Sequence, residues 1–219
     1  MQTVLGHRNL TLKPEPFFRD SFLLRGFVTN VLGLNVDDAF HTLSAADHVW
    51  THREDENFRY RGRPLPRTKA FFVRADPREL ERGLVLDSPP DPVPVYKYPG
   101  FQYGSIDMYR PFQAVPLVQQ LVNAVEDLTF NGRPVCINHV IATNYVGEDD
   151  NTSAHHDKTL DITPETPIIS ISLGETRVMR MQRGDRITDI VLRAGDLFVL
   201  GPETNKLYTH AIIPVSDED

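Results

Sequence analysis

The last third of the chain most constrains the fold, because it consists of short apolar segments separated by turn signals. In TPIISISLG, Ile169, Ile171 and Leu173 face one way, while Ser170 and Ser172 face the other. The Gly-Asp pairs and GPETN at 201–205 are typical of turns. Short alternating strands of this kind predict an antiparallel sandwich or jelly roll. The predicted strands are PVCINHVIATNY, TPIISISLG, TRVMRMQR, TDIVL, GDLFVLG and LYTHAIIPV.

Two helices are predicted before these strands. The segment 36–47 has an apolar face, and Asp37 or Asp38 would cap it. The segment 115–128 has an apolar stripe at helical spacing, with Pro116 suited to the first turn. Helices packed outside a β-sandwich give an α+β fold. The proline-rich stretch 89–99 predicts an ordered loop or an extended segment between the two parts.

Length and composition limit the class of protein. The chain has 219 residues, which suits a single domain with a sizeable core. Its one cysteine, Cys136, excludes an internal disulfide and favours an intracellular compartment, either cytoplasm or nucleus. We expect Cys136 to be buried and inert. No apolar run approaches the roughly 18 residues of a membrane helix. The net charge of −7 argues weakly against broad affinity for nucleic acid.

The segment SAHHDKTLDI at 153–162 contains the strongest chemical signal. In an extended chain His155 and Asp157 point to the same side, while His156 points away. With His210 from a later strand, they would form the two-histidine, one-carboxylate set that suits non-haem Fe(II). One alternative is a solvated hydrogen-bonded pair. The other is zinc, although a single cysteine excludes the common thiolate sites.

A second signal is the basic stretch 57–74, which contains six basic residues, no acidic ones and interleaved aromatic rings. Such cations could follow phosphates while the rings stack on a base. The alternative is a solvated edge strand whose arginines discourage pairing with other strands. The residues alone favour neither interpretation. The basic residues are Arg59, Arg61, Arg63, Arg67, Lys69 and Arg74.

Six segments, in order, resemble the AlkB family of Fe(II)/2-oxoglutarate dioxygenases, which remove alkyl groups from nucleic-acid bases. The resemblance covers about residues 60–214. AHHD matches the family's His-x-Asp motif, and the last segment matches the strand pair that brings in the distal histidine. The segments are PRTKAFF (66–72), FQYGS (101–105), CINHVIATNY (136–145), AHHD (154–157), PIISISLG (167–174) and GDLFVLGPETNKLYTHAIIPV (195–215).

The resemblance implies a double-stranded β-helix (jelly-roll) core at 136–219. Residues 1–135 would form N-terminal helices and a nucleotide-recognition lid of the same domain. Iron would be held by His155, Asp157 and His210. Tyr145 would bind 2-oxoglutarate, with Thr143 and Asn144 at the family's Asn-x-Tyr position. Alkylated DNA or RNA would be the partner of a monomer that binds no membrane. The substrate-binding residues implied are Arg61, Arg63, Arg67, Tyr103 and Asp161.

One difference from the family concerns the co-substrate. The family carries, beyond the distal histidine, an arginine that grips the distal carboxylate of 2-oxoglutarate, whereas this chain has no arginine after Arg193. We expect that the last core strand is missing from the chain, that another cation grips the co-substrate, or that activity has been lost. The alternatives are therefore an oxygenase acting on a protein, lipid or small molecule, and a non-catalytic binding module of the same fold.

Overall fold

The structure is a computed structural model. It describes residues 5–7, 12–51, 59–60, 63–65, 67–74, 109–159 and 162–215, with the backbone alone at 5–7, 59–60 and 63–64. The proline-rich stretch at 89–99 lies outside these residues.

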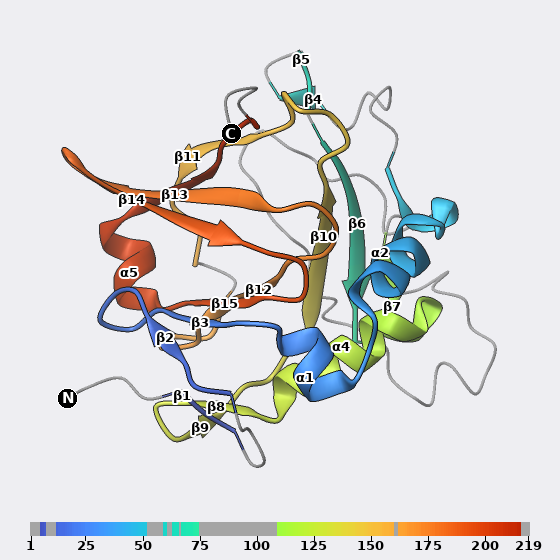
Figure 1. Ribbon diagram of the computed structural model, residues 1–219, viewed down its shortest axis with the longest axis horizontal. Helices are drawn as coiled ribbons and strands as arrows, with labels where there is room; N and C mark the ends of the chain where they lie inside the picture. Colours follow the sequence, from blue (N-terminus) through green and yellow to red (C-terminus); the bar gives the residue numbers. More distant parts are fainter. Residues whose placement is uncertain are drawn as a thin grey trace.

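Two four-stranded antiparallel sheets face each other and form a jelly roll (Figure 1). Residues that alternate along the strands meet between the sheets, including Met179 and Met181 from one sheet and Phe198 and Leu200 from the other. The predicted jelly-roll core is therefore confirmed. The first sheet has the order β11 (Thr152–His155), β16 (Thr209–Ile212), β13 (Arg177–Arg183) and β14 (Arg186–Leu192). The second has the order β12 (Ile168–Ile171), β15 (Leu197–Leu200), β3 (Phe22–Leu24) and β2 (Glu15–Pro16).

The second sheet is covered on both faces, which explains why all four residues of β15 are buried. Phe198 and Leu200 pack between the sheets, whereas Leu197 and Val199 pack outward with Phe27 of α1 (Phe27–Leu32). A strand buried on both faces is a continuous apolar run rather than an alternating one. The central strand β15 pairs with β3, so the N-terminal part of the chain completes the core sheet. The division at residue 136 remains a prediction, but strands from both sides of it share one sheet.

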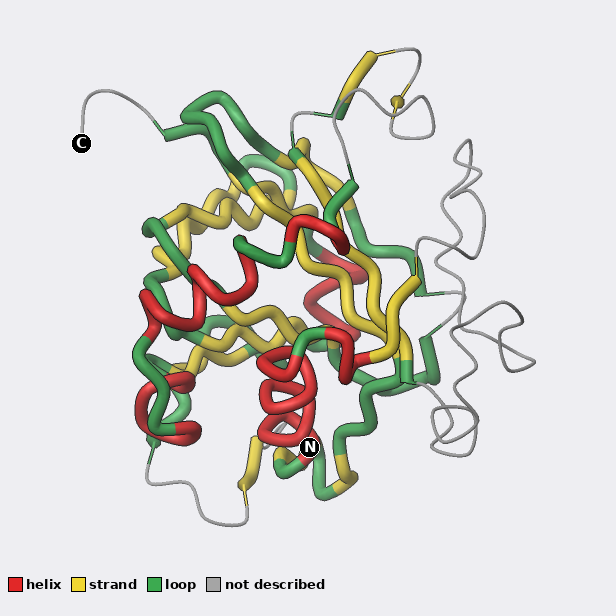
Figure 2. Tube along the Cα trace, turned by 90° about the vertical axis from the view of Figure 1, so that its right-hand side faces the viewer, coloured by secondary structure: helices red, strands yellow, loops and turns green. Residues whose placement is uncertain are grey.

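A third sheet lies beside the jelly roll. It has the order β10 (His139–Asn144), β6 (Thr68–Val73) and β7 (Tyr109–Pro111). Its Ala70 and Phe72 pack on α2 (Val36–Ser44) and α4 (Pro116–Glu126). Figure 2 faces this helical side of the molecule. The remaining elements are β1 (Leu5–His7), β4 (Arg59–Tyr60), β5 (Arg63–Pro64), β8 (Leu128–Phe130), β9 (Arg133–Pro134), α5 (Pro202–Leu207) and the 3-10 turns Asp47–Val49 and Phe112–Ala114.

Three local expectations need correction. Helix α2 is capped by Asn35, whose side-chain oxygen accepts hydrogen bonds from the backbone N–H groups of Asp37 and Asp38. The expected turn at 201–205 is instead the start of α5, because Asp20, far away in the sequence, accepts hydrogen bonds from the N–H groups of its first turn. Cys136 is exposed rather than buried.

Within the described residues, no helix has the length and apolar character needed to span a bilayer.

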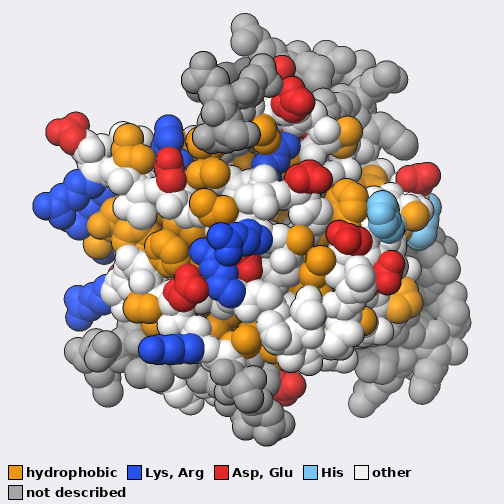
Figure 3. Space-filling model, in the orientation of Figure 1, with side chains coloured by type: hydrophobic (Ala, Val, Ile, Leu, Met, Phe, Trp, Pro, Cys, Tyr) orange, Lys and Arg blue, Asp and Glu red, His pale blue; other side chains and the backbone are white. Residues whose placement is uncertain are grey.

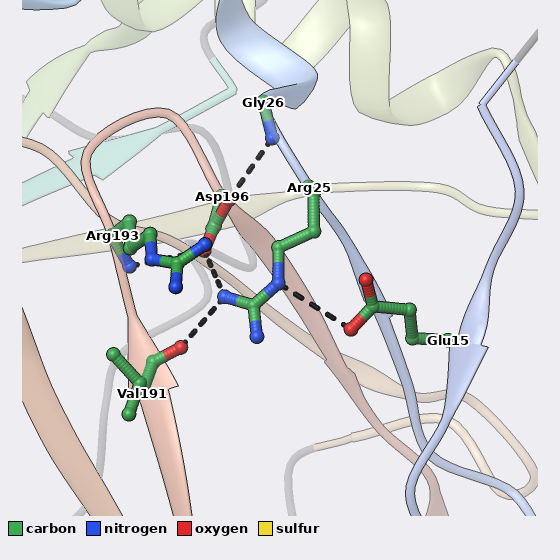
Figure 4. A network of polar contacts seen from close by, with 6 residues as sticks. All are labelled: Glu15, Arg25, Gly26, Val191, Arg193 and Asp196. Atoms are coloured by element: carbon green, nitrogen blue, oxygen red, sulfur yellow. Dashed lines mark hydrogen bonds and ion pairs between the residues drawn. The ribbon is translucent and has the colours of Figure 1, made fainter.

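The buried carboxylate of Asp196 connects the residues that follow β3 to the turn before β15 (Figure 4). Asp196 is 2% exposed and accepts hydrogen bonds from the backbone N–H groups of Gly26 and Arg193, at 2.9 and 3.0 Å. The Arg25 guanidinium donates to the same carboxylate at 2.6 Å and to the Val191 carbonyl at 2.7 Å. A buried charge is tolerated when its hydrogen-bonding capacity is filled in this way. Asp196 therefore joins the start of α1 to the turn before β15.

We predict that Asp196→Ala lowers the free energy of unfolding by roughly 2–4 kcal/mol, because it leaves buried N–H groups and a cation without their acceptor. The matched control is Asp189→Ala. Asp189 pairs with Arg180, but both side chains are 40% exposed, and such pairs contribute about 0–1 kcal/mol. Urea denaturation measures both variants. Equal losses in the two would contradict a special role for the buried carboxylate.

Candidate metal centre

The pairing of two strands brings the two predicted histidines together. His155 is the last residue of β11, and His210 is the second residue of β16. The two strands are antiparallel, and in their register His155 lies directly opposite His210. Their ring centroids are 4.4 Å apart. A sequence separation of more than fifty residues thus becomes a direct cross-strand contact.

Asp157 completes the cluster from the loop after β11. One carboxylate oxygen lies 3.4 Å from Nε2 of His155, and the other lies 3.4 Å from Nε2 of His210. One ligand atom from each residue can be chosen so that all lie within 4.8 Å of one another, and each side chain is partly buried. Two imidazole nitrogens and one carboxylate oxygen on one side leave other coordination positions open, as Fe(II) oxygenases require.

The charges of these groups depend on one another. Burial lowers the pKa of His210 to about 4, although the Asp157 carboxylate opposes this shift. Burial also acts to lower the pKa of His155, but its hydrogen bonds to Asp157 and to the Ser153 carbonyl outweigh burial and raise it. Burial acts to raise the pKa of Asp157, yet the histidines and Lys69 bring it below its usual value. An ionised carboxylate therefore faces a neutral His210, which is the state a divalent metal needs.

Hydrogen bonds to the backbone orient the ligand side chains. Nδ1 of His155 lies 2.8 Å from the Ser153 carbonyl; with a proton on Nδ1, this contact orients the ring so that Nε2 points toward the Asp157 carboxylate. His156 turns away, as predicted, and its Nδ1 lies 2.6 Å from the Asn205 carbonyl. The donor set therefore fits a metal. Nδ1 of His210 is buried and has no hydrogen-bond partner among the described residues.

Asn205 fixes the backbone of Asp157 from both sides. Its side-chain oxygen accepts from the Asp157 N–H at 2.9 Å, and its side-chain nitrogen donates to the Asp157 carbonyl at 2.9 Å. Asn205 is 3% exposed and lies on α5. The sequence interpretation missed this residue. No local sequence pattern around Asn205 predicts its contact with a loop 48 positions earlier in the chain.

Helix α5 is itself held by Asp20, which is 2% exposed. Its carboxylate accepts from the N–H groups of Glu203 and Thr204, at 2.7 and 3.0 Å, and from the Thr204 hydroxyl. A carboxylate at a helix start satisfies N–H groups that lack partners within the helix. The N-terminal segment thus supports the candidate metal ligands through Asp20, α5 and Asn205. Sequence reasoning missed Asp20 as well.

The residues expected to bind the co-substrate lie at the end of β10. Tyr145 is mostly buried, and its hydroxyl is 2.7 Å from the Thr152 hydroxyl, three residues before His155. Burial raises its pKa, so the phenol stays protonated. Val140 and Ala142 pack toward the helices, so strand alternation places Thr143 with Tyr145 on the side facing the candidate site. By the same alternation, Asn144 faces the helices.

The structure divides the basic stretch 57–74 into different environments. Phe71 and Phe72 are 1% and 0% exposed, so neither ring can stack on a base as the sequence suggested. Lys69 is buried near the candidate metal centre; burial and the nearby Arg67 lower its pKa to about 8, although the Asp157 charge opposes this. Arg74 is engaged with Glu126 and the Ile137 carbonyl. Base stacking by Phe71 and Phe72 and surface phosphate contact by Lys69 therefore do not fit the structure, and Arg74 already has an ion-pair partner.

Arg67 remains beside the candidate centre. Its guanidinium donates to the Asn151 carbonyl at 2.8 Å, on the segment that leads into β11. Its positive charge also acts to lower the pKa of both His155 and Tyr145. Arg61, Tyr103 and Asp161 lie outside the described residues, and only the backbone of Arg63 is described, in β5.

Residues 55–219 match the family model of the 2OG-Fe(II) oxygenase superfamily. The match covers most of the chain, including all three residues of the candidate centre. The chain belongs to this superfamily, and it is an Fe(II)- and 2-oxoglutarate-dependent oxygenase. Its cofactors are therefore Fe(II) and the co-substrate 2-oxoglutarate.

A solved structure described as "The structure of OsALKBH1" is similar to the whole chain. The TM-score is 0.54 over 93% of this chain and 88% of that one, at 16% sequence identity. At that identity the likeness establishes the fold. The resemblance predicted from the sequence is thus confirmed at the level of the oxygenase superfamily and of the fold. No curated protein sequence matches the chain.

We predict that Asn205→Ala weakens Fe(II) binding by about 10- to 100-fold, because the loop carrying Asp157 loses both of its amide contacts. The control is Lys206→Ala, whose side chain is exposed on the same helix. Anaerobic competition with a chromogenic chelator measures the affinity. An unchanged affinity in a folded Asn205→Ala protein would show that the loop keeps its position without the amide.

Proposed function

We propose that His155, Asp157 and His210 hold the Fe(II) of this oxygenase. The observation that carries the proposal is the meeting of two histidines and one carboxylate at the β11–β16 pair. The Ser153 carbonyl orients the His155 ring, and the Asn205 side chain holds the loop that carries Asp157 in place. When bound, iron and 2-oxoglutarate together activate O₂ for the hydroxylation of a C–H bond. The protein supplies the ligands, their orientation and a partly dry site.

Tyr145 and Thr143 are proposed to contact 2-oxoglutarate. Thr143 lies on the face of β10 turned toward the candidate centre, Tyr145 follows the strand directly, and the Tyr145 hydroxyl reaches β11 through Thr152. A phenol that stays protonated can donate a hydrogen bond to a carboxylate. Asn144 is not included among the proposed 2-oxoglutarate contacts, because it faces the helices.

The proposed substrate is an alkylated base in DNA or RNA, from which the alkyl group leaves as an aldehyde after hydroxylation. Arg67 supports this choice, because it places a fixed cation next to the candidate centre. The lid arginines Arg61 and Arg63 precede it in the chain, and Tyr103 and Asp161 complete the proposed substrate set. Cations at the rim of a site can hold the phosphates that flank an extruded base.

A protein or small-molecule substrate is the second candidate, and the overall charge of −7 favours it. Figure 3 shows the basic side chains of one face mainly over the half that carries β13, β14 and α5. A polyanion would therefore depend on local cations at the lid rather than on the general field of the protein.

We predict that the protein, given Fe(II), 2-oxoglutarate and O₂, releases formaldehyde from oligonucleotides with N-methylated bases. His155→Ala loses the activity because the metal loses a ligand, whereas His41→Ala, an exposed histidine on α2, keeps it. Formaldehyde and succinate are quantified together. Succinate without formaldehyde would favour another substrate class. Metal-loaded protein that forms neither product would favour the non-catalytic module.

Removal of lid charges gives the second readout of this proposal. Changing Arg61, Arg63 or Arg67 to Gln should weaken binding of a single-stranded oligonucleotide. The slope of log affinity against log salt should fall by about 0.7 for each phosphate that the variant no longer binds. Arg133→Gln is the control, since Arg133 is exposed on β9, at the far end of the molecule from β4 and β5 (Figure 1). Unchanged slopes in all the lid variants would contradict a nucleic-acid substrate.

A further inference from the structure

We propose that Arg177, on β13, holds the distal carboxylate of 2-oxoglutarate. Its guanidinium lies over the ring of Tyr145, with 5.6 Å from Cζ to the ring centroid. One terminal nitrogen, Nη2, donates to the Gly147 carbonyl at 3.0 Å. The other, Nη1, is buried and has no hydrogen-bond partner among the described residues. Arg177 also forms no ion pair with any residue that the structure describes. A buried cationic donor without an acceptor is costly, and a ligand carboxylate would satisfy it.

The register of the first sheet places Arg177 in line with the metal centre. Met181 lies opposite His210, and Met179 lies opposite Ile212. Both methionines point into the core between the sheets, so Arg177, at the same alternation, points inward as well. Four residues along a strand span about 13 Å between Arg177 and Met181. An arginine side chain and a five-carbon dicarboxylate reaching from the metal can bridge that span.

Tyr145 lies along the same line. Its hydroxyl contacts Thr152, and Thr152 lies opposite Ile212, in the row between the histidines and Arg177. The order from one end to the other is therefore the metal ligands, then Thr152 with the Tyr145 hydroxyl, then the guanidinium. A dicarboxylate with its keto-acid end at the metal would place its far end between the phenol and Nη1. The two donors would then share one carboxylate.

A purely structural role for Arg177 makes a different prediction. The contact with Gly147 fastens the turn 146–150, whose N–H groups at Val146 and Gly147 also donate to Asp150. An arginine that only fastens this turn would affect every ligand of the centre alike. An arginine that binds the distal carboxylate would affect only ligands that possess one. The two roles separate when one protein is tested with two keto acids.

The experiment compares 2-oxoglutarate with 2-oxopentanoate, which has a methyl group in place of the distal carboxylate. Binding to the Mn(II)-loaded protein is measured by calorimetry without O₂, so that turnover plays no part. We expect Arg177→Gln to weaken 2-oxoglutarate by about 10- to 100-fold and to leave 2-oxopentanoate unchanged. The control is Arg180→Gln. Arg180 points from the opposite face of β13, pairs with Asp189 and is 40% exposed, so this variant should bind both acids like the parent.

Two results would overturn the assignment of Arg177. In one, Arg177→Gln binds 2-oxoglutarate as tightly as the parent; in the other, both acids weaken by the same factor. Should Arg177→Gln fail to fold, Arg177→Lys keeps a charge with a different shape, and the same comparison of the two acids decides. The inference rests on the proposed metal centre, and the two failures are distinguishable. A parent protein that takes up no Mn(II) would overturn the centre itself, whereas retained metal with an unchanged 2-oxoglutarate affinity would overturn the arginine alone.

Discussion

The structure depends above all on the register between β11 and β16. This register places His155 opposite His210, and a slip by one residue would turn one of the rings to the other face of the sheet. The slip is opposed on both sides of the pair. On one side, β16 is fixed by its pairing with β13, whose methionines fill the core. On the other, Asn205 holds the loop that follows β11, and Asp20 holds the helix that carries Asn205. Buried polar contacts therefore maintain a site that apolar packing alone would leave loosely specified.

Much of the fold could be predicted from the sequence, because local pattern and burial agree in it. The alternation of TPIISISLG became β12, and the stripe after Pro116 became α4. The convergence of His155 with Asp157 was also predicted, although Asp157 lies in the loop after β11, where Asn205 rather than strand pairing holds it. The pattern failed where distant residues decide the outcome. The GPETN segment forms a helix because Asp20, far away in the sequence, caps it. Phe72 is buried because helices cover one face of β6, and Phe71 is buried because Tyr109 and Ile141 pack on the other face, which a count of charges and rings could not reveal.

The distribution of charge links the fold to the proposed chemistry. Two arginines lie near Tyr145 and come from different elements, Arg67 from before β6 and Arg177 from β13. Both positive charges act to lower the pKa of its hydroxyl. The acidic balance of the whole chain makes such placed cations more important for anionic ligands than the overall field. One arginine is proposed to bind a nucleic-acid substrate and the other the co-substrate. The two anions would then not compete for one guanidinium.

X-ray absorption at the iron edge tests the central claim most directly, because it counts imidazole ligands without requiring a substrate. The Fe(II)-loaded protein should show the scattering of two imidazole rings among nitrogen and oxygen neighbours. His210→Ala should lose one ring or lose the metal. A spectrum without imidazole scattering, or one that His210→Ala leaves unchanged, would contradict the assignment of the iron to the β11–β16 pair.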